Sequence, residues 1–227
     1  MKKLKKPSKK LLVLIVFVVV AGLLVAWHVA NHGKNSDGTK ANLSGNNRSN
    51  FLKLSDENVV LTNKAINAML DESADAESQK TAAYNNAQEL GGAIKALYST
   101  DTETTFNKTW KVYMDQAFVY AAASKKGDEA AKTTALNTIN TGYTVPLSQY
   151  LSKLNPAITE VTVRAGLAQH AAYMLQMAGE HAQGKLAQET ADLQQDRALT
   201  KTVFGVIADG IKHGKASDPN KRTYKKL

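Results

Sequence analysis

The sequence predicts an all-α protein, with an N-terminal transmembrane helix followed by an extracytoplasmic antiparallel bundle of about six helices. Three observations support this prediction. One apolar run near the N-terminus is long enough to span a bilayer, and the later apolar residues recur at helical spacing. No stretch shows the two-residue alternation of a strand. The chain of 227 residues has only 4 Pro and no Cys, so few helix breaks and no disulfides are expected.

The apolar run is residues 11–30, LLVLIVFVVVAGLLVAWHVA, which contain no formal charge. About twenty such residues cross a hydrocarbon core of roughly 30 Å as a helix. A cleaved signal peptide is the alternative, but its apolar core is shorter and a small residue occupies the −3 position. Cleavage after Ala26 or Ala30 would put Leu24 or His28 there. We therefore expect an uncleaved anchor that contacts the lipid bilayer through residues 11–30.

The formal net charge of +9 belongs to the two ends of the chain. Residues 1–10 hold six Lys, which predicts a cytoplasmic N-terminus and a single-pass protein of the cell membrane, with the bulk of the chain extracytoplasmic. Six of the last sixteen residues are also basic. Between residues 51 and 211, 14 basic residues face 18 acidic ones, a net charge of −4. Nucleic-acid binding is therefore not expected.

Composition divides the chain into five parts. A basic cytoplasmic end (1–10) and the anchor (11–30) are followed by residues 31–50, which are rich in Asn, Gly, Ser and Lys and are predicted to form a flexible tether. Residues 51–212 are predicted to form the helical-bundle domain. Residues 213–227 are predicted to be a basic, disordered tail.

Six helices are expected in the bundle, joined by short loops that force neighbours to pack antiparallel. They are predicted at about 56–73, 76–98, 102–126, 128–154, 159–183 and 185–212. Ser55 and Asp101 are the expected N-caps of the first and third helices, and Gly127 and Gly184 are expected to end the third and fifth. The fourth should kink between residues 142 and 146, because Pro146 lacks a backbone donor.

Two helices carry matching apolar seams with the spacing 4-3-4-3-4, as on a helix that faces a bundle. In the third helix the seam is Phe106, Trp110, Tyr113, Ala117, Tyr120 and Ser124; in the fifth it is Val163, Leu167, His170, Met174, Met177 and His181. An offset of 57 residues superposes them and matches Tyr113 with His170. We infer two pseudo-repeated hairpins that form a four-helix core over residues 102–212, with the first hairpin (56–98) packed on it.

Several segments resemble a loose group of uncharacterised bacterial helical-bundle proteins built of repeated helical hairpins. The segments are NNAQELGGAIKALY (85–98), FNKTW (106–110), YAAASKKGD (120–128), PLSQYLSKLNP (146–156) and LAQH (167–170). The resemblance covers about residues 61–212, and it implies a secreted or membrane-anchored protein but no particular activity. Members of the group often have His in the seam of each repeat. This chain keeps His170 but has Tyr113 at the equivalent place.

The residues that could hold a metal are His170, Met174, Met177 and His181, which share one face of the fifth helix. Imidazole and thioether ligands together suit copper, and Met suits Cu(I) in particular. The other interpretation, which we favour, is that these residues belong to the core, since Met fills cores well. All four span three helical turns, so one ion would need adjacent members and a second helix.

The sequence contains none of the motifs expected for a catalytic or nucleotide-binding site. Glu-x-x-His pairs, His-Glu-x-x-His, P-loops, Gly-x-Gly-x-x-Gly and Gly-x-Ser-x-Gly are all absent. We therefore expect no enzyme and no cofactor, and instead a membrane-anchored binding or interaction module of a bacterial cell surface. Its expected partner is an anionic cell-surface polymer or another protein. The alternative is a copper-binding protein that uses the seam of His and Met residues.

Overall fold

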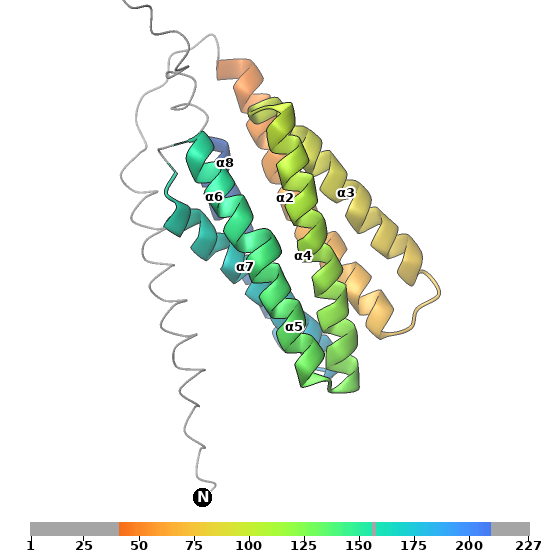
Figure 1. Cartoon of the computed structure of the whole chain (residues 1–227). Helices are drawn as coiled ribbons and strands as arrows, with labels where there is room; N and C mark the ends of the chain where they lie inside the picture. Colours follow the sequence, from red (N-terminus) through yellow and green to blue (C-terminus); the bar gives the residue numbers. More distant parts are fainter. Residues whose placement is uncertain (1–40, 156–157, 210–227) are drawn as a thin grey trace, which may run out of the picture. The chain divides into compact units, whose positions relative to one another are not determined.

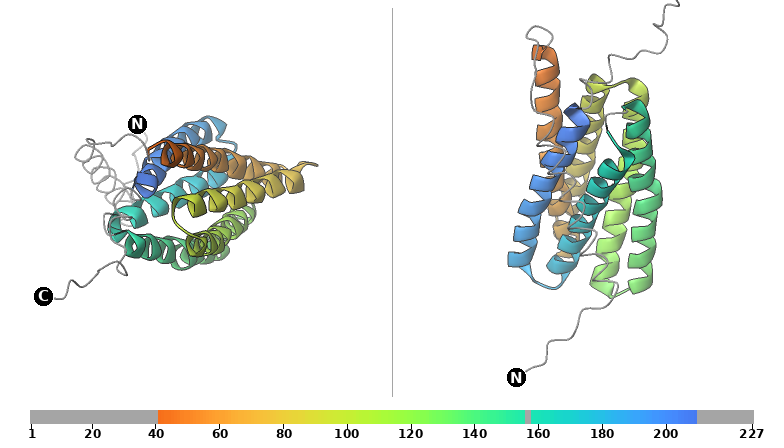
Figure 2. Two further views of the ribbon diagram at one scale, coloured as in Figure 1. Left: turned by 90° about the horizontal axis from the view of Figure 1, so that it is seen from above. Right: turned by 90° about the vertical axis from the view of Figure 1, so that its left-hand side faces the viewer.

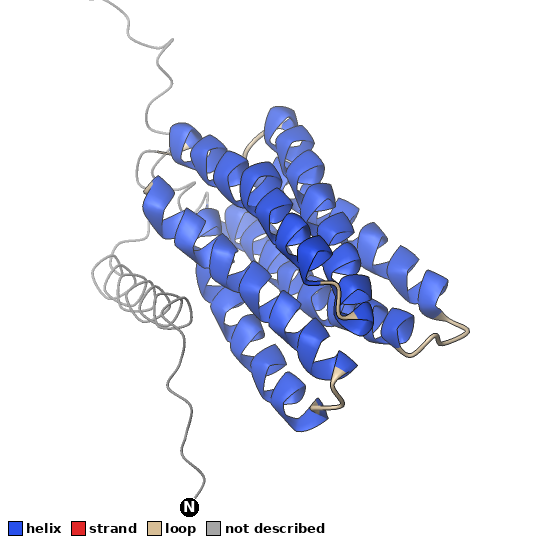
Figure 3. Ribbon diagram, turned by 60° about the horizontal axis from the view of Figure 1, so that its bottom comes forward, coloured by secondary structure: helices blue, strands red, loops and turns tan. Residues whose placement is uncertain are grey.

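The computed structural model describes residues 41–155 and 158–209, which form helices joined by short loops (Figures 1 and 3). No strand occurs among these residues, so the all-α prediction is confirmed. The helices are α2 (Ala41–Leu70), α3 (Ala76–Leu97), α4 (Thr100–Lys126), α5 (Glu129–Ile139), the π-helix η1 (Asn140–Thr144), α6 (Val145–Leu154), α7 (Glu160–Ala182) and α8 (Leu186–Asp209). The segments α5, η1 and α6 follow one another without a break, which gives the six helices that were expected.

The helices pack as three successive hairpins (Figure 2). The pairs α2 with α3, α4 with α5, and α7 with α8 are in contact. Between hairpins, α3 packs on α4, α4 and α6 pack on α7, and α2 packs along α8. The first hairpin thus covers the four-helix assembly of residues 100–209.

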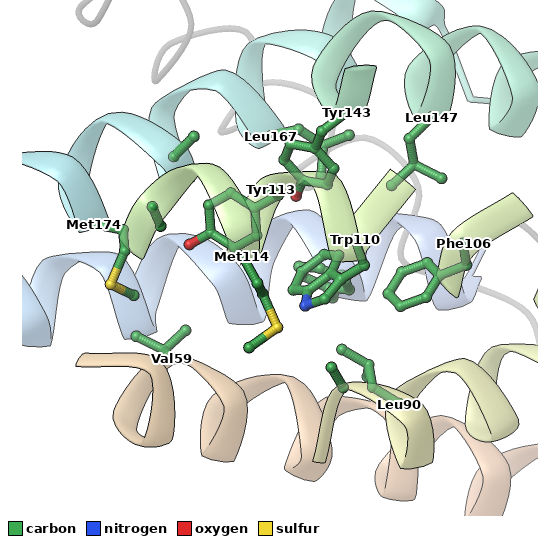
Figure 4. Packing of buried hydrophobic residues seen from close by; sticks show 14 of the residues in the cluster. Val59, Leu90, Phe106, Trp110, Tyr113, Met114, Tyr143, Leu147, Leu167 and Met174 are labelled. Atoms are coloured by element: carbon green, nitrogen blue, oxygen red, sulfur yellow. The ribbon is translucent and has the colours of Figure 1, made fainter. Parts of the chain in front are cut away.

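Trp110 lies at the centre of the core, with only 2% of its surface exposed (Figure 4). Its ring centroid is 4.8 Å from that of Phe106, 5.4 Å from that of Tyr143 and 5.6 Å from that of Phe204. The Tyr143 and Phe204 pairs meet edge to face, an arrangement that adds about 0.5–1.5 kcal/mol per pair beyond simple burial. This cluster joins α4, η1 and α8, and it confirms that the aromatic seam of α4 is core.

The helix ends follow local rules. Gly127 and Gly184 end helices as predicted, with φ angles of 68° and 69°, a left-handed conformation that costs Gly little. The predicted cap Asp101 is wrong: Ser99 caps α4, and its Oγ accepts a hydrogen bond of 3.3 Å from the N–H of Thr102. Asp101 lies in the first turn, where its charge suits the helix dipole.

The predicted start of the first helix is also wrong. Helix α2 begins at Ala41, so residues 41–50 are helical and are not part of a flexible tether. Tertiary contacts explain the difference, because Phe51 packs on Phe204 of α8 at 5.3 Å and Arg48 pairs with Asp209. Such contacts override the weak helix propensity of Asn, Gly and Ser. Ser55 is therefore internal to α2, and its Oγ donates to the carbonyl of Leu52.

The predicted kink before Pro146 appears as the π-helix η1. The N–H of Val145 donates to the carbonyl of Asn140, five residues earlier, which is the π-helical register. This shift absorbs the missing N–H of Pro146 without breaking the helix. Gly142 packs closely on α4, since a Cβ there would lie 2.8 Å from Cγ1 of Val112.

Several predicted segments lie outside the described residues: the basic end (1–10), the anchor (11–30), the first part of the tether (31–40) and the tail (213–227). In the part of the chain that is described, no helix is both long enough and apolar enough to cross a membrane.

Candidate functional site

The four candidate metal ligands all lie on α7, but in different surroundings. His170, Met174 and Met177 are buried, whereas the side chain of His181 is 12% exposed. His170 and His181 are eleven residues apart, which is about 16 Å along a helix axis. The structure therefore separates the two imidazoles into two polar clusters, one inside the core and one near the end of α7.

The inner cluster is built on a buried pair of His170 and Asp196. Nδ1 of His170 lies 2.9 and 3.0 Å from the two carboxylate oxygens of Asp196, which is 0% exposed. Thr200, one turn further along α8, is within 3.5 Å of both side chains. Burial raises the pKa of Asp196, although His170 opposes this rise. With Asp196 ionised, Nδ1 is the donor of this pair, because an ionised carboxylate only accepts.

Aromatic rings enclose His170. The ring of Trp110 stacks on the imidazole at 5.9 Å, and that of Tyr113 is tilted against it at 5.1 Å. Tyr143 of η1 stacks on Tyr113 at 4.9 Å. Burial raises the pKa of both tyrosines far above the usual range, and the charge of Asp196 adds to the effect, so both phenols stay neutral.

The outer cluster is centred on His181. Nδ1 of His181 lies 2.9 Å from a carboxylate oxygen of Glu189, and Nε2 lies 2.9 Å from one of Asp71. Partial burial lowers the pKa of His181, but hydrogen bonds to Asp71 and Glu189 outweigh it, and the net shift is upward. The protonated imidazole, which this upward shift favours, donates from both nitrogens and links the end of α2 to α7 and α8.

Asn side chains of α2 extend this outer cluster into the bundle. Nδ2 of Asn63 donates to Glu189 at 3.1 Å and to the sulfur of Met177 at 3.6 Å. Asn67 donates to the same Glu189 oxygen. The sulfur of Met177 thus accepts a hydrogen bond inside the core. Among the described residues, no group of three or more His, Asp or Glu side chains is arranged to hold a metal ion.

The sequence patterns did not predict the carboxylates that pair with the two histidines. Glu189, Asp192, Asp196 and Thr200 recur at spacings of 3, 4 and 4, so they occupy the inward face of α8. Polar residues at seam spacing were the available signal, because buried charges are rare unless they are paired. The 57-residue offset between the repeats also marks Asp196 as a buried polar residue, because it aligns Asp196 with the apolar Ile139.

A second candidate site lies on the surface between α2 and α8. It is a groove of about 600 Å³ lined by Gly45, Arg48, Ser49, Leu52, Lys53, Asp56, Gln194, Arg197, Ala198 and Lys201. We call it the α2–α8 groove. Four of its ten lining residues are cationic and one is acidic, although residues 51–211 as a whole carry a net charge of −4.

Ion pairs shape both halves of this groove. Arg197 binds Asp56 through Nε and one terminal nitrogen, both at 2.7 Å, and Arg48 binds Asp209 in the same way at 2.7 and 3.1 Å. Such two-point pairs hold the planar guanidinium groups in fixed orientations. Lys201 is exposed and forms no ion pair with any described residue, and its charge helps Arg197 to lower the pKa of Asp56. Lys53 pairs with Glu57 of the same helix at 3.5 Å. Lys201 is therefore the one cation of the groove lining that has no ion-pair partner among the described residues.

No protein-family model, curated protein or solved structure matches this chain. The resemblance of residues 61–212 to secreted or membrane-anchored helical-bundle proteins stays a prediction.

Proposed function

We propose that this chain is a membrane-anchored, extracytoplasmic binding module that holds an anionic cell-surface polymer in the α2–α8 groove. The anchor in this proposal is the apolar run of residues 11–30, oriented by the Lys-rich residues before it. The bundle supplies a rigid surface on which side chains can be positioned. The concentration of cations in one groove of an otherwise acidic domain is the observation that carries the proposal.

The chemistry of the groove suits a polymer with repeated negative charges, such as phosphate groups. Arg48 and Lys53 are five residues apart on α2, and Arg197 and Lys201 are four apart on α8. At about 1.5 Å per residue, neighbouring cations are about 6–8 Å apart along each helix, so several can meet one extended chain. Arg binds phosphate through two parallel hydrogen bonds, and Lys binds it as a point charge.

The exposure of the groove side chains supports the same partner. The side chains of Arg48 and Arg197 are 38% and 37% exposed, and that of Lys53 is 71% exposed. A polymer can therefore approach without any rearrangement of the core. The chain also continues from Asp209, the partner of Arg48, into residues 212–227 with six basic side chains. These side chains would add to the attraction for a polyanion.

The proposal is tested with the full chain in nanodiscs of zwitterionic lipid and synthetic poly(glycerol phosphate) as the probe. We expect saturable binding that weakens as salt is raised, because the contacts are electrostatic. Charge reversal at two exposed groove positions, Lys53→Glu with Lys201→Glu, should weaken binding by about tenfold or more, on the order of 1.4 kcal/mol.

Lys64→Glu with Lys108→Glu is the matched control, since both are exposed lysines outside the groove lining and the net charge changes by the same amount. Equal loss of binding in the control and in the groove variant would mean that only the overall charge matters. Unchanged binding in both variants would exclude the groove as the site.

A further inference from the structure

Three buried polar atoms around His170 have no hydrogen-bond partner among the described residues. They are Nε2 of His170, Oη of Tyr113 and Oη of Tyr143. They come from α7, α4 and η1, and all three residues are at most 1% exposed. We call the set of His170, Asp196, Tyr113 and Tyr143 the His170 centre.

The members of this centre are close neighbours. The ring centroids of Tyr113 and His170 are 5.1 Å apart, those of Tyr113 and Tyr143 are 4.9 Å apart, and Asp196 is hydrogen-bonded to His170 at 2.9 Å. Both phenols also feel the charge of Asp196. Neither hydroxyl is within hydrogen-bonding distance and angle of that carboxylate. The four side chains are thus neighbours, although His170 Nε2 and the two phenol oxygens are not hydrogen-bonded to one another.

Other buried or half-buried aromatic polar groups of this protein do have direct partners. Nε1 of Trp110 donates to Asn58 at 3.3 Å, and Oη of Tyr98 donates to the carbonyl of Ile207 at 2.6 Å. Oη of Tyr84 donates to Asp115. Since about nine in ten buried polar groups in proteins are satisfied by protein or by ordered water, three unpartnered atoms on neighbouring side chains suggest a shared partner.

We propose that the His170 centre is an internal binding site for a water-sized neutral molecule, a buried water, that bridges His170, Tyr113 and Tyr143. The hydrogen-bond count fits such a ligand. In the tautomer that donates Nδ1–H to Asp196, Nε2 of His170 is left as an acceptor. Water can donate to Nε2 and accept from both phenol hydroxyls, which gives the three hydrogen bonds typical of a buried water.

The π-helix η1 is an independent reason to expect a ligand here. It supplies Tyr143, and its i→i+5 register turns this side chain relative to a regular α-helix. Short π-helical segments inside α-helices occur often at functional sites. Close packing of Gly142 on Val112 holds this segment against α4, next to Tyr113.

A metal ion is a weaker fit to the same atoms. A metal bound by tyrosine takes the phenolate, and burial together with the charge of Asp196 raises the pKa of Tyr113 and Tyr143, which works against that form. A neutral molecule that both donates and accepts needs no change of protonation at either tyrosine.

The first test is the stability of Tyr113→Phe and Tyr143→Phe in the full chain, measured by urea unfolding. If a water bridges the hydroxyls, each variant should be less stable, with the unfolding equilibrium constant raised about fivefold, the value of one ordinary hydrogen bond. If the hydroxyls are simply unsatisfied, each variant should be more stable, and this result would overturn the proposal. Tyr98→Phe, which loses a direct hydrogen bond to Ile207, gives the reference effect.

A second measurement does not depend on the variants. A high-resolution crystal structure of the wild-type chain should show an ordered density peak within hydrogen-bonding distance of Nε2 of His170 and of both phenol oxygens. Anomalous scattering from that peak would show a metal and would contradict the proposal. An absence of density there would contradict it as well.

Discussion

Tyr113 and His170 occupy equivalent positions of the two predicted hairpin repeats, and their rings lie 5.1 Å apart in the core. The two seams therefore face each other, with the aromatic member of one against the imidazole of the other. The same 57-residue offset matches Ile139 with Asp196, and Ile139 is also buried. The buried polar pair of the second hairpin, His170 and Asp196, thus stands where the first hairpin has Tyr and Ile.

Removing one member of this pair should be costly. Asp196→Ala leaves the imidazole without its acceptor, and we expect a loss of about 3–5 kcal/mol of unfolding free energy, as for other broken buried pairs. The double variant His170→Tyr with Asp196→Ile, which copies the first hairpin, should lose less than Asp196→Ala alone. Urea unfolding of both variants measures the difference. A double variant that is the less stable of the two would contradict this view of the pair.

His181 should make the stability of the bundle depend on pH. Its pKa is raised in the folded state by Asp71 and Glu189, above the ordinary value of 6.5. The stabilisation is therefore fully present below that value and is lost as pH rises through the higher folded-state pKa. Unfolding free energies at several pH values from 6 to 9 should fall with pH in the wild type, and this fall should be smaller in His181→Gln. An equal fall in the variant would assign the effect to other groups.

Two glycines of α7 provide a matched test of helix packing. A Cβ at Gly166 would overlap the branched side chain of Val203 on α8, whereas a Cβ at Gly179 would meet nothing within 4 Å. Gly166→Ala should therefore destabilise the protein by about 1–3 kcal/mol. Gly179→Ala should stabilise it by up to about 1 kcal/mol through helix propensity. Thermal unfolding of the two variants compares them directly, and similar shifts would show that α7 and α8 pack less closely than described.

The copper alternative can be tested by titrating the full chain with Cu(I) in detergent. Met174 and Met177 are completely buried, and both nitrogens of His181 are held by carboxylates. We therefore expect no binding tighter than about micromolar, or −8 kcal/mol. Met174→Leu and Met177→Leu should each cost less than about 1.5 kcal/mol of stability, as volume-conserving changes do. Tight binding that both variants abolish would favour a copper protein instead.

The proposed topology can be tested by protease treatment of intact cells. If residues 11–30 are an uncleaved anchor, exposed sites beyond them should be cut from outside while residues 1–10 stay protected. Replacing three apolar residues of the run, Val18, Val19 and Val20, with Asp should release the protein from the membrane, because each charge at the centre of a span costs about 2.5–3.5 kcal/mol. Protection of the whole bundle in intact cells would reverse the orientation.

The regular parts of the bundle were predictable because they depend on local patterns. The seam of Phe106, Trp110 and Tyr113 follows helical spacing, and the left-handed ends at Gly127 and Gly184 need a residue without a side chain. In both cases the deciding physics lies within a few neighbouring residues. Long loops or strands would not have shown apolar residues recurring at helical spacing.

The polar interior was not predictable in the same way. Asp196 is 26 residues from His170, and Asp71 is 110 residues from His181. Which carboxylate faces which imidazole depends on how α2, α7 and α8 pack, and no local pattern encodes this. The prediction of where α2 starts was wrong for a similar reason, since that start depends on the contact of Arg48 with Asp209, 161 residues away.

The register between α2 and α8 has a mechanical consequence. Their cross-links follow one another in antiparallel order: Arg48 with Asp209, Phe51 with Phe204, and Asp56 with Arg197. A load that pulls the N-terminal and C-terminal extensions apart would meet these contacts one after another, beginning with Arg48 and Asp209. The two helices would then separate progressively from one end, instead of sliding past each other along their whole length. A bundle held in a membrane through its N-terminal extension and pulled through its C-terminal extension would therefore yield stepwise, from its outermost ion pair inward.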